Sequence, residues 1–109
     1  MPFDPGLAER IRDVLAERHD VVEKRMFGGI AFMVSGHMCC GVATEDLMVR
    51  VGPDRYAEAL AHPHAREMDF TRKPLKGYVY VAPAGLETDE ALARWVGLGL
   101  AFVETLPPK

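Results

Sequence analysis

The chain has few of the residues that cross-link a small protein or anchor it in a membrane. Its two cysteines, Cys39 and Cys40, are neighbours. They make a poor disulfide, because successive side chains of a strand point to opposite faces. No second cysteine or histidine pair completes a metal set, so we predict no metal site and no cofactor. No stretch approaches the roughly 18 apolar residues of a membrane span.

An excess of positive charge is missing too. The 13 Lys and Arg against 16 Asp and Glu give a formal net charge of −3, whereas a dedicated nucleic-acid binder is usually basic. The residues from Met1 to Pro5 lack the basic and apolar regions of a secretory signal, which predicts a cytoplasmic protein. A length of 109 residues with 49% hydrophobic residues predicts one globular domain over residues 1–109.

The apolar patterns that are present predict an α+β fold, with helices packed on an antiparallel sheet. Apolar residues at i, i+4, i+7 and i+8 predict a first helix from Pro5 to about His19, with Asp4 as its N-cap. A short helix is expected at 53–61 and a last one at 88–105. Apolar runs between turn residues predict strands at 21–27, 30–34, 37–43, 47–51, 67–70 and 77–81. The predicted order is helix, four strands, helix, two strands, helix.

A turn at Ser35-Gly36 sets the register of the central strands. It pairs Phe32 with Cys39, and a three-residue loop at 44–46 then pairs Ala43 with Leu47. One sheet face is a plain core face. The other is also apolar, although a solvated face would be polar, and it collects Ala31, Met33, Met38, Cys40, Met48 and Arg50. Either the helices of this chain or a partner cover that second face.

Methionine suits adaptable contact surfaces because it is unbranched and polarizable. We therefore predict a homodimer, or contact with another protein. The candidate contact residues are Met33, Met38, Cys40, Met48 and Arg50. Replacing Met38 or Met48 with Glu is expected to disrupt association while leaving secondary structure intact.

Five cations support a different hypothesis, a weak nucleic-acid or anion site. They are Lys24, Arg25, Arg72, Lys73 and Lys76. The alternative is scattered solubilising charge, and a salt titration of DNA binding separates the two.

Enzymatic chemistry has little support in the sequence. No nucleophile elbow, phosphate loop or zinc signature is present, so we predict no catalytic residue. His62 and His64 flank a proline without two further ligands and are expected to be loop residues. His37 is expected at the surface or in a turn, and Trp95 in the core.

Several motifs together resemble a known family. The stretch Arg25-Met26-Phe27-Gly28-Gly29, the hairpin at Gly36 and the strands at 47–51 and 77–81 are similar to the N-terminal domain of the TfoX/Sxy proteins. The resemblance covers nearly the whole chain. It implies a secretion-chaperone-like α+β domain and a part in competence regulation, together with a cyclic-AMP-responsive activator on DNA.

Named members of that family carry a second, C-terminal domain, which is not expected here because the sequence stops at Lys109. The resemblance thus predicts a single-domain, non-enzymatic regulatory module that acts through protein–protein contacts. Weak nucleic-acid or anion binding remains the alternative.

Overall fold

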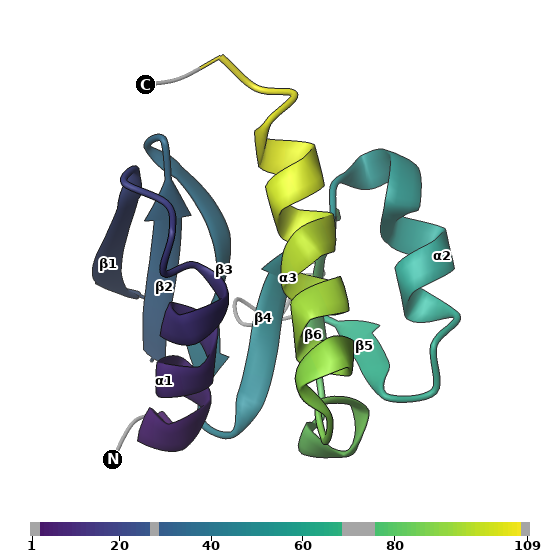
Figure 1. Cartoon of the computed structure of the whole chain (residues 1–109). Helices are drawn as coiled ribbons and strands as arrows, with labels where there is room; N and C mark the ends of the chain where they lie inside the picture. The colour runs from purple at the N-terminus through teal and green to yellow at the C-terminus, as the bar shows by residue number, and fades with distance from the viewer. Residues whose placement is uncertain (1–2, 27–28, 69–75, 108–109) are drawn as a thin grey trace.

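An antiparallel sheet carries the helices on one of its faces (Figure 1). The computed structural model describes residues 3–26, 29–68 and 76–107. Within them, six strands lie in the order β1-β2-β3-β4-β6-β5, and each neighbouring pair is antiparallel. The strands are β1 (Val21–Met26), β2 (Gly29–Val34), β3 (His37–Ala43), β4 (Asp46–Arg50), β5 (Ala65–Glu67) and β6 (Tyr78–Val81).

The helices begin close to the positions that the sequence predicts. They are α1 (Pro5–Val14), α2 (Tyr56–Leu60) and α3 (Asp89–Val103), with 3-10 turns η1 (Pro53–Arg55) and η2 (Pro83–Gly85). Asp4 caps α1 by accepting from the backbone N–H groups of Gly6 and Leu7 at 2.9 and 3.4 Å. The predicted α+β class and element order are confirmed.

The main core lies between the sheet and the pair α1 and α3, which run side by side over it (Figure 1). Ile11 of α1 and Val96 of α3 have no exposed surface, and they join Phe32, Leu47 and Val49 of the sheet in one cluster. At about 25 cal/mol per Å² of apolar area, burial of this cluster is the main force that holds the helices in place.

A glycine lets α3 lie close to the sheet. A Cβ on Gly99 would lie 2.8 Å from the carbonyl oxygen of Cys39 and 3.0 Å from its sulfur. By contrast, a Cβ on Gly97 would meet nothing within 4 Å. The close approach of α3 to the sheet therefore requires a glycine at position 99 but not at position 97.

A β-bulge corrects the predicted register of β2 and β3. Met33 pairs with Met38 as expected, but Phe32 pairs with Cys40 and not with Cys39. Cys39 is the extra residue of the bulge, and both cysteines lie in the helix-side core with 0% exposure. The predicted place of Cys40 on the opposite face is wrong, because a bulged residue shifts the alternation of every residue after it.

The loop between β3 and β4 differs by one residue as well. Ala43 pairs with Asp46, so the loop has two residues where three were predicted. Such a shift by itself would exchange the faces of β4, but the bulge shifts β3 by one residue and restores them. Leu47 therefore faces the helices and Met48 the opposite side, as predicted.

Two element boundaries also differ from the predicted ones. The first helix ends at Val14, well before the predicted His19. The fifth strand lies at Ala65–Glu67, earlier than the predicted 67–70, of which residues 69 and 70 fall outside the described part. The predicted helix end is wrong because the backbone continues in tighter turns after Val14: the N–H of Ala16 donates to the carbonyl oxygen of Asp13, and the N–H of Arg18 to that of Leu15.

Arg18 and Asp20 together link three segments that are distant in the sequence. The Arg18 guanidinium donates to both carboxylate oxygens of Asp20 at 3.0 Å and to Glu104 after α3 at 3.2 Å. The Ser35 hydroxyl in the β2–β3 turn donates to Asp20 at 2.6 Å. Asp20 is therefore the residue through which the start of β1 contacts both the hairpin and Arg18.

Acid should weaken this connection. The Arg18 guanidinium and the Ser35 hydroxyl lower the pKa of Asp20 from 3.8 to about 2. A carboxyl with a depressed folded-state pKa stabilises the fold above its unfolded pKa, and that contribution is lost as the pH falls toward the folded value. Between these two pH values, Asp20→Asn should therefore lose less stability than the wild type.

Urea midpoints at pH 5, 3 and 2 measure the difference. Asp54→Asn serves as the control, because the Asp54 carboxylate makes no hydrogen bond or ion pair with the described residues. If the urea midpoints of the wild type and Asp20→Asn fell by the same amount between pH 5 and pH 2, the prediction would be contradicted.

Candidate functional site

The described residues of the 25–29 motif lie in the paired strands β1 and β2. Met26 pairs with Gly29 across the connection from β1 to β2, while residues 27 and 28 lie outside the described part. A Cβ on Gly29 would collide with the carbonyl oxygen of Val42 in β3. Position 29 therefore requires glycine for steric reasons.

The sheet face opposite α1 and α3 has a small core of its own, which we call the methionine cluster. Its buried members are Ala31, Met38, Met48, Met68 and Tyr80, with Met33, Ala43 and Tyr78 partly buried beside them. Among the described residues, none from a helix belongs to it. The predicted sulfur-rich face exists, and the described helices do not cover it.

Most of the predicted contact residues have little surface to offer a partner. Met48 is 0% exposed and Met38 6% exposed, and Cys40 lies in the helix-side core. Met33 and Arg50 are half-buried. The Arg50 guanidinium lies 5.1 Å from the ring centroid of Phe102, in cation–π range. The expectation of one accessible face made by all five residues is therefore wrong, and Met33 is the apolar member that remains reachable.

Cys40 also lacks the chemistry of a reactive thiol. Its hydrogen bond with the Cys39 thiol and its burial raise the pKa of Cys40 above the ordinary value. A nucleophilic or redox-sensing cysteine needs the opposite shift together with access to solvent.

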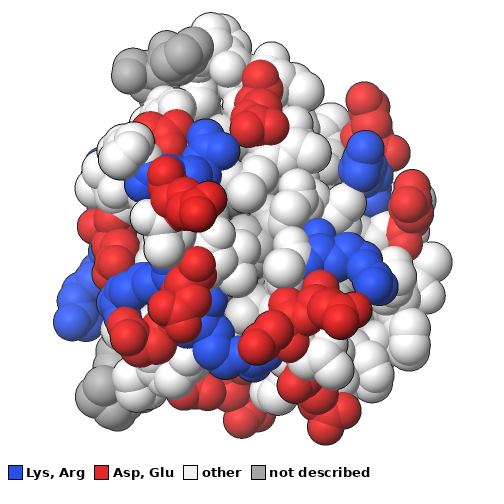
Figure 2. Space-filling model, viewed as in Figure 1, with Lys and Arg blue, Asp and Glu red and all other residues white. Residues whose placement is uncertain are grey.

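The described cations do not gather at one place. Lys24 and Arg25 are exposed on the edge strand β1, and Lys76 is exposed just before β6. Strands β2, β3 and β4 separate these positions, a distance of about 19 Å at ~4.8 Å per strand. Arg72 and Lys73 lie outside the described residues. On the face with the helices, Lys and Arg alternate with Asp and Glu (Figure 2).

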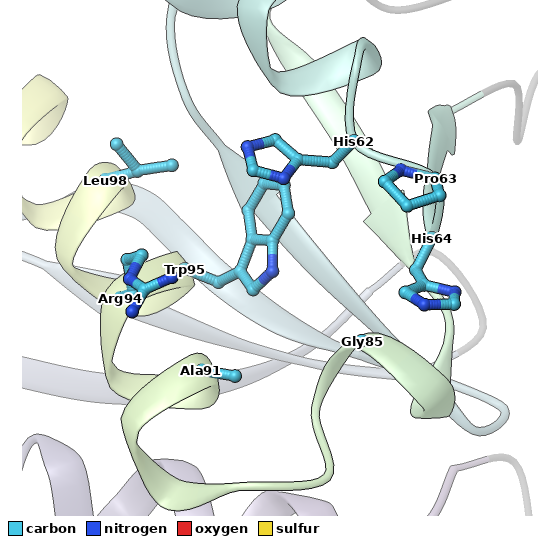
Figure 3. A pocket seen from close by; sticks show the side chains of 8 residues that line it. All are labelled: His62, Pro63, His64, Gly85, Ala91, Arg94, Trp95 and Leu98. Atoms are coloured by element: carbon cyan, nitrogen blue, oxygen red, sulfur yellow. The ribbon is translucent and has the colours of Figure 1, made fainter.

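A pocket of about 220 Å³ beside α3 joins residues that the sequence analysis treated separately (Figure 3). It is lined by His62, Pro63, His64, Gly85, Ala91, Arg94, Trp95 and Leu98. The His62 ring meets the Trp95 ring edge-on, with centroids 5.0 Å apart and an angle of 68° between the planes. Trp95 is 7% exposed, so its predicted packing role is confirmed. No local pattern indicates that the 62–64 turn lies against α3.

His37 is another residue whose place differs from the prediction. It is buried at the start of β3, with 9% exposure, and its Nε2 lies 2.6 Å from the carbonyl oxygen of Pro107. A carbonyl can only accept, so Nε2 donates. Neither expected position, at the surface or in a turn, is correct: His37 is the first residue of β3, and the chain after α3 returns to the hairpin and covers this side chain.

Two kinds of site are not found in residues 3–26, 29–68 and 76–107. No three His, Cys, Asp or Glu side chains are grouped to hold a metal ion there. Nor is any helix in these segments both long and apolar enough to span a bilayer.

The model of the TfoX N-terminal domain matches residues 13–103, which is 91 of the 109 residues. The chain belongs to this family. Its match runs from the end of α1 to the end of α3, so the TfoX N-terminal domain contains the whole sheet, the 25–29 motif and the pocket. Membership in this family suggests a regulatory, competence-related role. No curated protein and no solved structure matches the chain significantly.

Proposed function

We propose that this TfoX N-terminal domain is a regulatory module that acts through protein–protein contact, as a homodimer in the cytoplasm and without an enzymatic activity of its own. The observation that carries the proposal is the family match over residues 13–103. The crowded environment of Gly29 adds support, because it gives the most recognisable motif of the chain a structural and not a catalytic reason.

The contact that we assign to a second copy is the outer corner of the sheet at β1 and β2. Val22 is 57% exposed, and it pairs directly with the half-buried Met33 across the two strands. Opposed residues of an antiparallel pair share a face, and here it is the face of the methionine cluster. Identical apolar patches brought together by a twofold axis are the usual basis of a homodimer.

Val22→Glu should convert the dimer into a monomer in sedimentation equilibrium, because it places a carboxylate at the centre of the proposed contact. Val14→Glu is the matched control, since Val14 is also an exposed valine, with 37% exposure, but lies on α1. Both positions face solvent in the monomer, so each substitution should change the free energy of unfolding by about 0.5 kcal/mol or less. Circular dichroism verifies that both variants are folded.

A wild type that sediments as a monomer at high micromolar concentration would contradict the homodimer. Equal association by Val22→Glu and the wild type would contradict the assignment of the contact to β1 and β2.

A further inference from the structure

The pocket beside α3 has a flat apolar wall. Trp95 is almost fully buried, so packing in the core fixes the plane of its indole ring. Ala91 and Leu98 lie one turn before and one turn after it on the same side of α3. Figure 3 shows the indole in the middle of the pocket, with the His62 ring over one end. Since Trp95 is 7% exposed, a ligand ring can reach only a small part of the indole, and an edge-on contact suits such a small area.

The opposite wall is held in place by backbone contacts. The backbone N–H of Ala82 donates to the carbonyl oxygen of His64 at 2.9 Å. A Cβ on Gly85 would lie 2.8 Å from the Cβ of His64, so a larger residue would push the 62–64 turn away from η2. The pocket is thus already formed without a ligand, which lowers the cost of binding one.

The polar groups around this pocket are suited to a negative charge. Arg94, His62 and His64 line it, and no Asp or Glu among the described residues does. Arg94 is exposed and makes no ion pair or hydrogen bond with any described residue, so its guanidinium is available to a ligand. The chain as a whole carries a net charge of −3, so this local composition is opposite to the overall balance.

We propose that the pocket binds a small organic anion with a flat apolar part, of the class of aromatic carboxylates. The ring would lie against Trp95, and the carboxylate would accept from Arg94, for which a planar guanidinium is well shaped. The volume of about 220 Å³ is below the roughly 300–1,000 Å³ of sites for drug-sized ligands, so a single ring with a carboxylate suits it better than a nucleotide. This inference does not depend on the proposed dimer.

The test uses benzoate and benzamide, which share a ring and differ in charge. Trp95 is the chain's single tryptophan, so its indole N–H gives one NMR resonance that reports on the pocket. Benzoate should shift this resonance along a saturable curve, and benzamide should bind about 10-fold more weakly or not at all, because it cannot form the charge-assisted bond.

Arg94→Gln should weaken benzoate binding about 10-fold and leave the response to benzamide unchanged. Arg55→Gln is the matched control, since Arg55 is exposed but lies outside this pocket. The amide spectrum of each variant verifies its fold. The proposal would be overturned by no saturable shift at millimolar benzoate, by equal affinities for the two compounds, or by wild-type affinity in Arg94→Gln.

Discussion

Replacing Gly29 with alanine is expected to lower the free energy of unfolding by about 3 kcal/mol or more, the upper end of overpacking costs. The added Cβ would collide with the carbonyl oxygen of Val42 and lie 3.1 Å from the Cα of Ala43. These are backbone atoms within the sheet, so no side-chain rotation relieves the collision. Small domains have a total stability of about 5–15 kcal/mol, so the loss is a large share of it and the urea midpoint should fall clearly. Urea unfolding followed by circular dichroism measures the loss.

Gly97→Ala provides the matched control. Its Cβ would meet nothing within 4 Å, and alanine is favoured over glycine inside a helix by roughly 0.5–1 kcal/mol. We therefore expect a small gain in stability from the same chemical change at a different place. A Gly29→Ala variant as stable as the wild type would contradict the steric role of the motif.

A second large effect is expected from Met48→Glu. Met48 has 0% exposure within the methionine cluster, so the new carboxylate would be buried there. We expect a loss of about 3–5 kcal/mol, as for other unpaired buried charges. The sequence-based expectation that this change leaves secondary structure intact assumed an exposed side chain, and the burial of Met48 removes that assumption.

Two further variants, Met48→Leu and Met33→Glu, separate the effect of a buried charge on stability from the effect of a changed side-chain shape. Leucine nearly conserves the volume, so Met48→Leu should cost less than about 1.5 kcal/mol. Met33 is half-buried on the same face, and Met33→Glu should cost less than Met48→Glu because its carboxylate can reach water. Thermal unfolding of the three variants compares them. Equal stability of Met48→Glu and Met48→Leu would show that the carboxylate reaches solvent and that the cluster is open.

Much of the fold can be predicted from the sequence because its signals are local. Ser35 and Gly36 both have positive φ, 51° and 85°, as a tight hairpin turn requires. Asp4 followed by proline starts α1 with the predicted cap. Each of these choices depends on a few neighbouring residues, so each is visible before any tertiary contact is known.

The register beyond the hairpin turn depends on contacts between distant residues. The bulge residue Cys39 supplies all three atoms nearest to a Cβ placed on Gly99. A sequence in which Cys39 and Cys40 are adjacent and alike gives no sign of which one is the extra residue. The pocket cannot be predicted from the sequence for the same reason, since His62 meets Trp95 only after the sheet and α3 have packed.

Because the bulge places both cysteines in the helix-side core, their reactivity can report on the opening of the domain. Because both thiols lie between β3 and the helices with no exposed surface, a sulfhydryl reagent can attack only after those layers separate. The rate at which the reagent modifies the thiols in native buffer therefore measures how often the domain opens. The measurement needs neither denaturant nor an added labelling site.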